Sequence, residues 1–348
     1  MRLIVHVGME KTGTTSLQEF LYENIELLSA NGVYLSTRLG GINNRKLSGF
    51  SAEKDGGYWA TRGISNLKQK NDHFRGFRKD FKNHVNKAKT THHTMVVTCE
   101  NLWRCVREDA ELEKLKTLFE GLFDSITIIG YFRRPDDHFR SMYSTYVRTS
   151  GKLGFEEYCR TQKKTELDRV YDFSQGAKAW EKHFGKDNLL FRAFDRSALV
   201  NGDVRSDFIN LFWPELSERL IFSKKLSNEK QSVAVRNAML CINRAFPRYD
   251  NNGVSSVNEY LKEVAMKYQF NNKTKETLSS GLGVELSLNN EYAQSLREFF
   301  SSYLTTIDAT AILSDLSSGS SPDEINMNEL RDLFVLLLNS LNKHLNNE

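Results

Sequence analysis

The segment Val7–Ser16, VGMEKTGTTS, combines two glycines, one lysine and several hydroxyl residues. Gly8 and Gly13 allow the backbone to turn tightly, and Lys11 places a positive charge inside the turn. The hydroxyl residues are Thr12, Thr14, Thr15 and Ser16. A loop that leads into a helix presents free backbone N–H groups and the positive end of the helix dipole, which together bind phosphate-like anions. The segment therefore predicts an anion-binding loop.

This loop differs from the ATPase phosphate loop, GxxxxGK[ST], in the position of its lysine. Gly8 and Gly13 have the separation of that pattern, but Thr14 stands where the ATPase lysine would be. The lysine is Lys11, inside the loop. The hydroxyl residue that binds Mg²⁺ directly after the ATPase lysine therefore loses its context. The order of residues disfavours a loop for magnesium-bound ATP.

Glu100 is the predicted general base. It ends the apolar segment TMVVTCE, 94–100, which reads as a strand. A carboxylate buried at a strand terminus can have a raised pKa and accept a proton from a substrate. The alternative is a structural role, in which Glu100 caps the following helix or pairs with Arg104.

Other titratable residues offer weaker candidates for the same role. Glu10 lies inside the loop and is a second carboxylate that could approach a substrate. His92 and His93 are expected just before a strand, at its wrong end for a ligand. His6 lies within the first predicted strand, so we expect it to be a packed histidine.

Apolar segments that read as strands alternate with segments of helical periodicity. Strands are expected at 3–7, 32–35, 94–100, 125–132 and 188–194. Helices are expected at 14–29, 74–85, 109–122, from Pro135 onward and at 172–184, and the chain beyond the last strand is expected to be mainly helical. Residues 36–71 are rich in Gly, Ser, Asn and charge, and we expect a long irregular insertion there.

The alternation predicts an α/β fold, with a central parallel β-sheet flanked by helices and a mainly helical C-terminal part. The unbroken apolar run at 125–132 suits a central strand. Ligands on such sheets bind at the carboxyl ends of the strands. The Gly8 loop, Glu100 and Arg133 each follow a predicted strand, so we expect them at one edge of the sheet.

The motif G-x-x-K-T-G-T-T-S after a first strand resembles the 5′-phosphosulfate loop of sulfotransferases that use 3′-phosphoadenosine 5′-phosphosulfate (PAPS). RRPDDHFRS adds Arg133 and, eight residues later, Ser141, the spacing of that family's 3′-phosphate motif. VVTCENLW and AWEKHFGKDNLLFRAFDRSAL resemble segments of carbohydrate-type and bacterial members. The resemblance implies a P-loop-like sulfotransferase domain over 1–240, with an insertion at about 36–90, and a helical extension, 241–348, packing on the same domain.

The resemblance also implies roles for individual residues. Lys11 would contact the 5′-phosphate and the bridging oxygen, while the N–H groups and hydroxyls of Thr12 to Ser16, with Gly13 among them, would surround the 5′-phosphate. Arg133 and Ser141 would bind the 3′-phosphate, and Glu100 would act as the base. The implied cofactor is PAPS, with PAP as its product, and no metal is required in this family.

The charge distribution bears on the acceptor. The chain has a net charge of +4, and from Arg62 to Lys89 nine Lys or Arg residues stand against two Asp. This stretch is either a solvated helix face or a surface that attracts a polyanion. With Glu100 as the base, it favours sulfation of a hydroxyl or amino group of an anionic carbohydrate. The alternatives are a P-loop kinase or NTPase, and a non-catalytic polyanion-binding protein.

The remaining features predict the compartment. The four cysteines, Cys99, Cys105, Cys159 and Cys241, form no CxxC pair and have no histidine at zinc spacing. The sequence contains no signal-peptide pattern and no apolar run long enough for a membrane span. We therefore expect a cytoplasmic protein with reduced thiols and no nucleic-acid partner. The sequence does not indicate the sulfated position or the oligomeric state.

Overall fold

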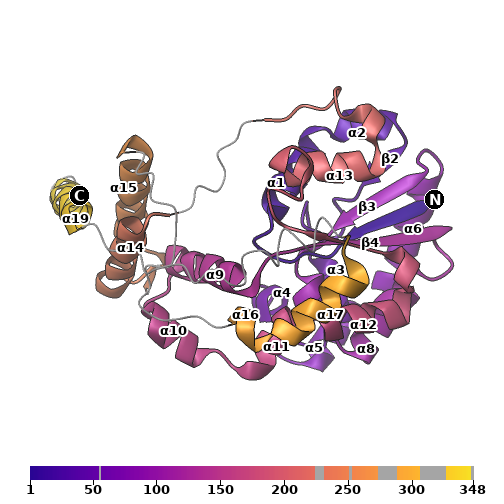
Figure 1. Cartoon of the computed structure of the whole chain (residues 1–348), viewed down its shortest axis with the longest axis horizontal. Coiled ribbons are helices and arrows are strands. Elements are labelled where there is room, and N and C mark those ends of the chain that lie inside the picture. The colour runs from indigo at the N-terminus through magenta and orange to yellow at the C-terminus, as the bar shows by residue number, and fades with distance from the viewer. Residues whose placement is uncertain (55, 224–230, 251–252, 273–287, 306–326, 346–348) are drawn as a thin grey trace. The chain divides into compact units, whose positions relative to one another are not determined.

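In the computed structural model the chain forms two compact units (Figure 1). The structure describes residues 1–54, 56–223, 231–250, 253–272, 288–305 and 327–345. Unit 1 consists of Met1–Arg134, Lys164–Lys225 and Asn289–Leu316. Unit 2 consists of Pro135–Lys163, Leu226–Leu288 and Ser317–Glu348. Both units are therefore assembled from segments that are distant in the sequence.

The centre of unit 1 is a five-stranded parallel sheet with the order β2-β3-β1-β4-β5. The strands are β1 (Arg2–His6), β2 (Val33–Leu35), β3 (Thr94–Thr98), β4 (Ser125–Phe132) and β5 (Leu189–Ala193). All of β3 is buried, as expected for a parallel strand covered on both faces. The predicted α/β class with a central parallel sheet is confirmed, and β4 is an interior strand as expected.

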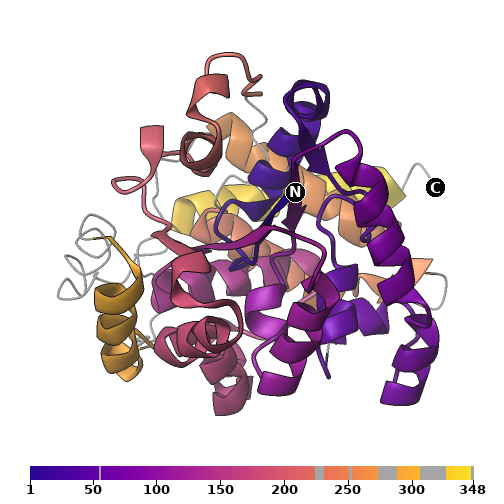
Figure 2. The same ribbon diagram turned by 90° about the vertical axis from the view of Figure 1, so that its right-hand side faces the viewer.

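Helices cover both faces of this sheet. The described helices of unit 1 are α1 (Thr14–Glu23), α2 (Ile25–Ala30), α3 (Lys46–Ser51), α4 (Gly56–Ala60), α5 (Leu67–His73), α6 (Phe77–Lys89), α7 (Leu102–Cys105), α8 (Asp109–Phe119), α11 (Lys164–Tyr171), α12 (Phe173–Phe184), α13 (Val204–Phe212), α16 (Leu288–Glu291, which begins at the unit boundary) and α17 (Ala293–Tyr303). Short 3-10 turns occupy Lys186–Asn188, Val200–Gly202 and Pro214–Leu216. Figure 1 shows α1 and α13 on one side of the strands and α8 and α12 on the other, and Figure 2 gives the view turned by 90°.

Neighbouring residues of β4 pack on opposite faces of the sheet, because successive strand side chains point to opposite sides. Tyr131 belongs to the cluster that joins the sheet to Phe20 of α1 and Phe208 of α13. Phe132 packs on the opposite face, with its ring centroid 4.5 Å from that of Trp103 and 5.2 Å from that of Phe173. The core of unit 1 is thus a sheet between two apolar layers.

The helix predicted at 14–29 is interrupted at Asn24, so it forms α1 and α2. The Asn24 side chain exchanges two hydrogen bonds with the backbone of Ile221, donating from Nδ2 to the carbonyl at 3.0 Å and accepting at Oδ1 from the N–H at 2.8 Å. These contacts with a distant segment fix the break, and helical periodicity alone does not reveal it.

The expectation of an irregular insertion at 36–71 is wrong, because the segment contains α3, α4 and α5. These short helices are held by aromatic packing. The ring centroids of Phe50 and Phe74 are 5.6 Å apart, and Trp59 donates from Nε1 to the carbonyl of Gly49 at 3.0 Å. Phe74 lies at the end of α5, so the helix predicted from residue 74 begins at Phe77.

Unit 2 is mainly helical. Its elements are α9 (Pro135–Thr149), α10 (Phe155–Thr161), α14 (Val233–Ala245), β6 (Tyr249–Asp250), β7 (Gly253–Val254), α15 (Ser256–Asn272) and α19 (Met327–Leu345). The buried Asn243 of α14 donates from Nδ2 to the carbonyls of Val147 and Gly151 at 2.6 and 2.8 Å, which ties α14 to the end of α9. Among the described residues of the whole chain, no helix is long and apolar enough to cross a membrane.

Candidate active site

The loop that follows β1 is fastened to the carboxyl edge of the sheet. Val7 donates its N–H to Ile129 at 2.9 Å, Met9 donates to Tyr131 at 2.9 Å, and Tyr131 donates to Gly8 at 2.8 Å. These bonds continue the β1–β4 pairing beyond the last residue of β1. The start of the loop therefore has a fixed position beside the ends of its neighbouring strands.

The loop then turns through residues with positive φ, at Gly8 (117°), Lys11 (63°) and Gly13 (74°). A Cβ at Gly8 would lie 2.4 Å from the backbone oxygen of Glu100, so only glycine fits against the segment that follows β3. Thr12 closes the turn by donating its hydroxyl to the Met9 carbonyl at 2.6 Å. A curled backbone of this kind can direct several N–H groups towards one anion.

Helix α1 begins at this turn without a capping side chain from any described residue. Gly13 is its N-cap, and its first turn contains no acidic residue. Backbone N–H groups in the first turn have no carbonyl partner within a helix. The N–H groups of Thr14, Thr15 and Ser16 are therefore donors that a bound anion can satisfy, and the helix dipole favours negative charge at this position.

The hydroxyls predicted to surround a phosphate divide into two pairs. Thr12 and Thr14 are buried, and both donate within the protein, Thr12 to Met9 and Thr14 to Oε2 of Glu100. Thr15 is exposed and Ser16 is half-buried, so their hydroxyls are accessible to a ligand. Lys11 is also half-buried. The hydroxyls of Thr15 and Ser16 are thus available to a ligand, while those of Thr12 and Thr14 hold the loop in its conformation.

Glu100 lies in the turn after β3, directly beside the loop. Burial raises the pKa of its carboxyl group, and the charge of Glu10 acts in the same direction. The hydrogen bond from Thr14 and the charges of Arg45 and Lys11 oppose this effect without cancelling it. A carboxylate with a raised pKa binds a proton more readily than an ordinary glutamate, which suits a general base.

The second carboxylate, Glu10, is compensated by a cation. Its Oε1 lies 3.2 Å from Nη2 of Arg104 and accepts a hydrogen bond from Nδ2 of Asn101 at 3.1 Å. Asn101 is also the N-cap residue of α7. The structure therefore pairs Arg104 with Glu10, and these two contacts fix the Glu10 carboxylate beside α7.

The histidines lie where the sequence predicted. His6 is fully buried as a packed residue, with its ring centroid 6.0 Å from that of Tyr131. Burial lowers the pKa of His6 to about 4. His92 and His93 precede β3, at the amino edge of the sheet, and His92 Nε2 lies 2.9 Å from the hydroxyl of Ser29. These positions confirm that neither His92 nor His93 neighbours the Gly8 loop.

Arg133 directly follows β4 and is half-buried, and its backbone N–H lies 3.5 Å from the sulfur of Met9. It therefore borders the loop. Ser141 lies on α9 in unit 2, where it is half-buried. The pairing of Arg133 with Ser141 around one phosphate would join the two units, and it stays a prediction.

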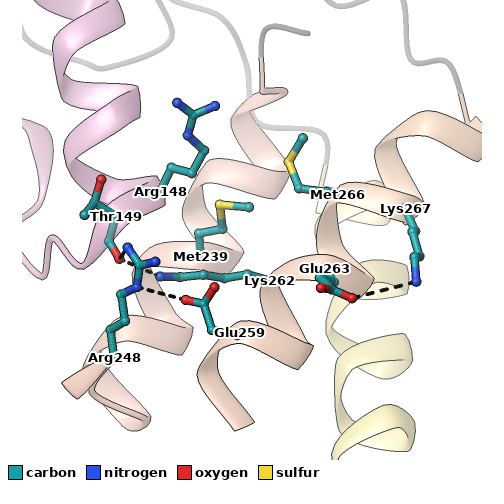
Figure 3. Close-up of a pocket in the computed structure, with 9 residues that line it drawn as sticks. All are labelled: Arg148, Thr149, Met239, Arg248, Glu259, Lys262, Glu263, Met266 and Lys267. Carbon is teal, nitrogen blue, oxygen red and sulfur yellow. Dashed lines mark hydrogen bonds and ion pairs between the residues drawn. The ribbon is translucent and has the colours of Figure 1, made fainter. Parts of the chain in front are cut away.

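A cavity of about 470 Å³ in unit 2 contains several charged residues (Figure 3). Two of its cations have structural partners: Arg248 and Lys262 both donate to the carbonyl of Thr149, at 3.1 and 3.0 Å, and Arg248 pairs with Glu259 at 2.9 Å. Positive side chains at the last carbonyl of α9 stabilise the end of that helix. None of the predicted site residues lines this cavity.

Arg45 was not identified from the sequence, although its charge acts on Glu100. It lies in the segment that we expected to be an irregular insertion, between β2 and α3. An arginine in a segment rich in Gly, Ser and Asn carries no recognisable motif. Only the folded position of this segment reveals its relation to Glu100.

No protein-family model matches the chain, and no curated protein matches it. Among solved structures, the chain is similar to a sulfotransferase from Alicyclobacillus acidocaldarius, with 13% sequence identity and a TM-score of 0.38. The match covers 86% of this chain and 94% of that one. A likeness at this TM-score does not transfer residue roles from one chain to the other.

Proposed function

We propose that this protein is a sulfotransferase that transfers the sulfuryl group of PAPS to a hydroxyl or amino group of an anionic carbohydrate. One observation carries the proposal. A curled loop with Lys11 in the left-handed region leads into the uncapped helix α1, and the same loop touches a carboxylate with a raised pKa, Glu100. This arrangement would put a bound anion next to a proton acceptor, as transfer of an anionic group to a hydroxyl requires.

PAPS as the sulfuryl donor is supported by the hydrogen-bond donors and cations near the loop. The N–H groups at the start of α1 would bind the 5′-phosphate end of the nucleotide, and Lys11 would offset the charge that develops on the leaving oxygen. Arg133, at the next strand end, would bind the 3′-phosphate with its planar pair of N–H groups, together with Ser141. Bound PAPS would supply the activated sulfuryl group.

In the proposed transfer, the acceptor oxygen forms a bond to sulfur while the bond from sulfur to the phosphate oxygen breaks. The proton of the acceptor hydroxyl passes to Glu100. Thr14 would hold Glu100 in place through its hydrogen bond, and Lys11 would stabilise the departing phosphate. Transfer to an amino group requires the same loss of a proton.

An anionic carbohydrate as acceptor is supported by the cationic surface of α6. Its exposed residues include five cations, Arg78, Lys79, Lys82, Lys87 and Lys89, against one carboxylate, Asp80. Phe81 and Val85 form the buried face. A helix surface with this excess of positive charge attracts a polyanion.

The proposal is tested by nucleotide binding without magnesium. PAP should raise the melting temperature of the protein in the presence of EDTA, because a ligand that binds only the folded state stabilises it. Lys11→Ala should reduce PAP affinity at least tenfold and nearly abolish sulfuryl transfer. Lys163→Ala, which removes an exposed lysine, is the matched control and should leave both unchanged.

The same measurements distinguish the alternatives. Stabilisation by ATP with Mg²⁺, but not by PAP, would favour a kinase or NTPase. Salt-dependent binding of heparin that survives Lys11→Ala, without PAP binding by the wild type, would favour a polyanion-binding protein. Transfer of sulfate by Lys11→Ala at the wild-type rate would remove Lys11 from the mechanism.

A further inference from the structure

The segment between β2 and α3 is pinned to the end of β3 by one buried asparagine. Asn44 accepts from the N–H of Thr98 at 2.8 Å and donates from Nδ2 to the carbonyls of Ser36 and Gly41, at 2.6 and 2.9 Å. Thr98 also donates its hydroxyl to the carbonyl of Ile42 at 2.8 Å. The segment therefore has a fixed position two residues before Glu100.

Arg45 follows Asn44 and is half-buried beside this edge. Its Nε is buried and has no hydrogen-bond acceptor among the described residues, and Arg45 forms no ion pair with a described carboxylate. A buried donor without a partner costs free energy, and a charged donor costs more than a neutral one. A ligand that supplied an acceptor would remove this cost.

The position of Arg45 places its charge in the field of the candidate base. Glu10, Arg45 and Lys11 are among the charged groups that act on Glu100, and Thr14 contributes a hydrogen bond. Glu10 has its own cation in Arg104. Arg45 is thus a cation that acts on Glu100 from outside the Gly8 loop, and its Nε has no partner among the described residues.

We infer that Arg45 binds the carboxylate of an acidic sugar in the acceptor and so places the neighbouring hydroxyl against Glu100. The inference rests on the proposed function and adds that the acceptor carries its carboxylate close to the sulfated position. A guanidinium group matches a carboxylate through two parallel hydrogen bonds, which fixes orientation as well as charge. Arg45 is therefore a specificity-determining residue of the acceptor site.

The test measures acceptor binding to the PAP-saturated protein by calorimetry. The probes are an oligosaccharide containing uronic acid and the same oligosaccharide after reduction of its carboxyl groups. Wild type should prefer the acidic form, and Arg45→Ala should weaken its binding roughly tenfold to a hundredfold while changing binding of the reduced form less than threefold. Arg45→Lys keeps the charge but loses the planar pair of N–H groups, so its affinity for the acidic form should lie between those of wild type and Arg45→Ala.

Arg38→Ala is the matched control, because it removes an exposed arginine from the same segment and should preserve the preference. PAP affinity should be the same in all variants, which verifies that the loop is intact. Equal losses for both oligosaccharides in Arg45→Ala, or no preference for the acidic form in the wild type, would overturn the inference. Failure of the wild type to bind PAP is a separate result, and it would overturn the proposed function itself.

Discussion

His6 makes the stability of unit 1 depend on pH in a way that can be calculated from its burial. The side chain is fully buried in β1, and within the described part of the chain neither ring nitrogen has a hydrogen-bond partner. Burial lowers its pKa from 6.5 to about 4, because the charged imidazolium loses its hydration. The neutral ring is therefore the form that fits the folded protein.

The direction in which stability changes with pH follows from proton binding. Between pH 6.5 and pH 4 the unfolded chain binds a proton at His6 that the folded protein excludes, so stability falls as the pH falls through this range. A difference of about 2.5 in pKa corresponds to about 3 kcal/mol for the complete effect at 1.36 kcal/mol per pKa unit. At pH 5, where the unfolded state is mostly protonated, the loss is about 2 kcal/mol relative to pH 7.5.

The substitution that isolates this effect is His6→Leu. Leucine has no titrating group and leaves no buried donor or acceptor without a partner, so it should cost little at pH 7.5. All four tryptophans, Trp59, Trp103, Trp180 and Trp213, lie in unit 1, so urea unfolding followed by tryptophan fluorescence reports on the unit that contains His6. Relative to wild type, His6→Leu should gain about 2 kcal/mol between pH 7.5 and pH 5. A difference between the two proteins that is constant over this range would refute the reasoning.

Three further predictions concern the site and its support. Thr14→Val removes the hydroxyl that stabilises the charged form of Glu100, so the acid limb of the kcat/KM profile should move to higher pH; an unchanged limb would show that Glu100 is not the base. Gly8→Ala should lower the melting temperature and abolish PAP binding, since its Cβ would lie 2.4 Å from the backbone oxygen of Glu100; normal PAP affinity would contradict this. Asp207→Ala should cost about 3–5 kcal/mol in urea unfolding, because it removes a buried carboxylate that pairs with Arg192 at 2.7 Å and accepts from the Tyr131 hydroxyl at 3.0 Å.

The sheet was predictable because its strands carry a local signal. The apolar runs of β1, β3 and β4 are too short for buried helices and are followed by turns, and the loop after β1 contains glycines where the backbone has positive φ. Once the strands are parallel, their carboxyl ends must meet at one edge, so the proximity of Glu100 to the loop follows from topology. The contact between Gly8 and the Glu100 carbonyl is a direct consequence of that arrangement.

The insertion was not predictable in the same way. Helices α3, α4 and α5 are short, and helices of this length are unstable unless tertiary contacts support them. Those contacts join residues such as Phe50 and Phe74 that are far apart in the segment, so no local periodicity reports them. Arg45 was missed for the same reason, since its position depends on how Asn44 binds the end of β3.

The different roles that we propose for Glu10 and Glu100 could also be inferred only from the folded structure. The sequence offers both Glu10 and Glu100 as candidates for the base, and Arg104 as a possible partner of Glu100. In the structure Glu10 accepts from both Arg104 and Asn101, so proton transfer to Glu10 would disrupt an ion pair. Glu100 accepts a hydrogen bond from the neutral hydroxyl of Thr14, and burial raises its pKa. Two carboxylates in different environments can take different roles, and this difference supports our proposal that Glu100 accepts the proton while Glu10 remains in its ion pair.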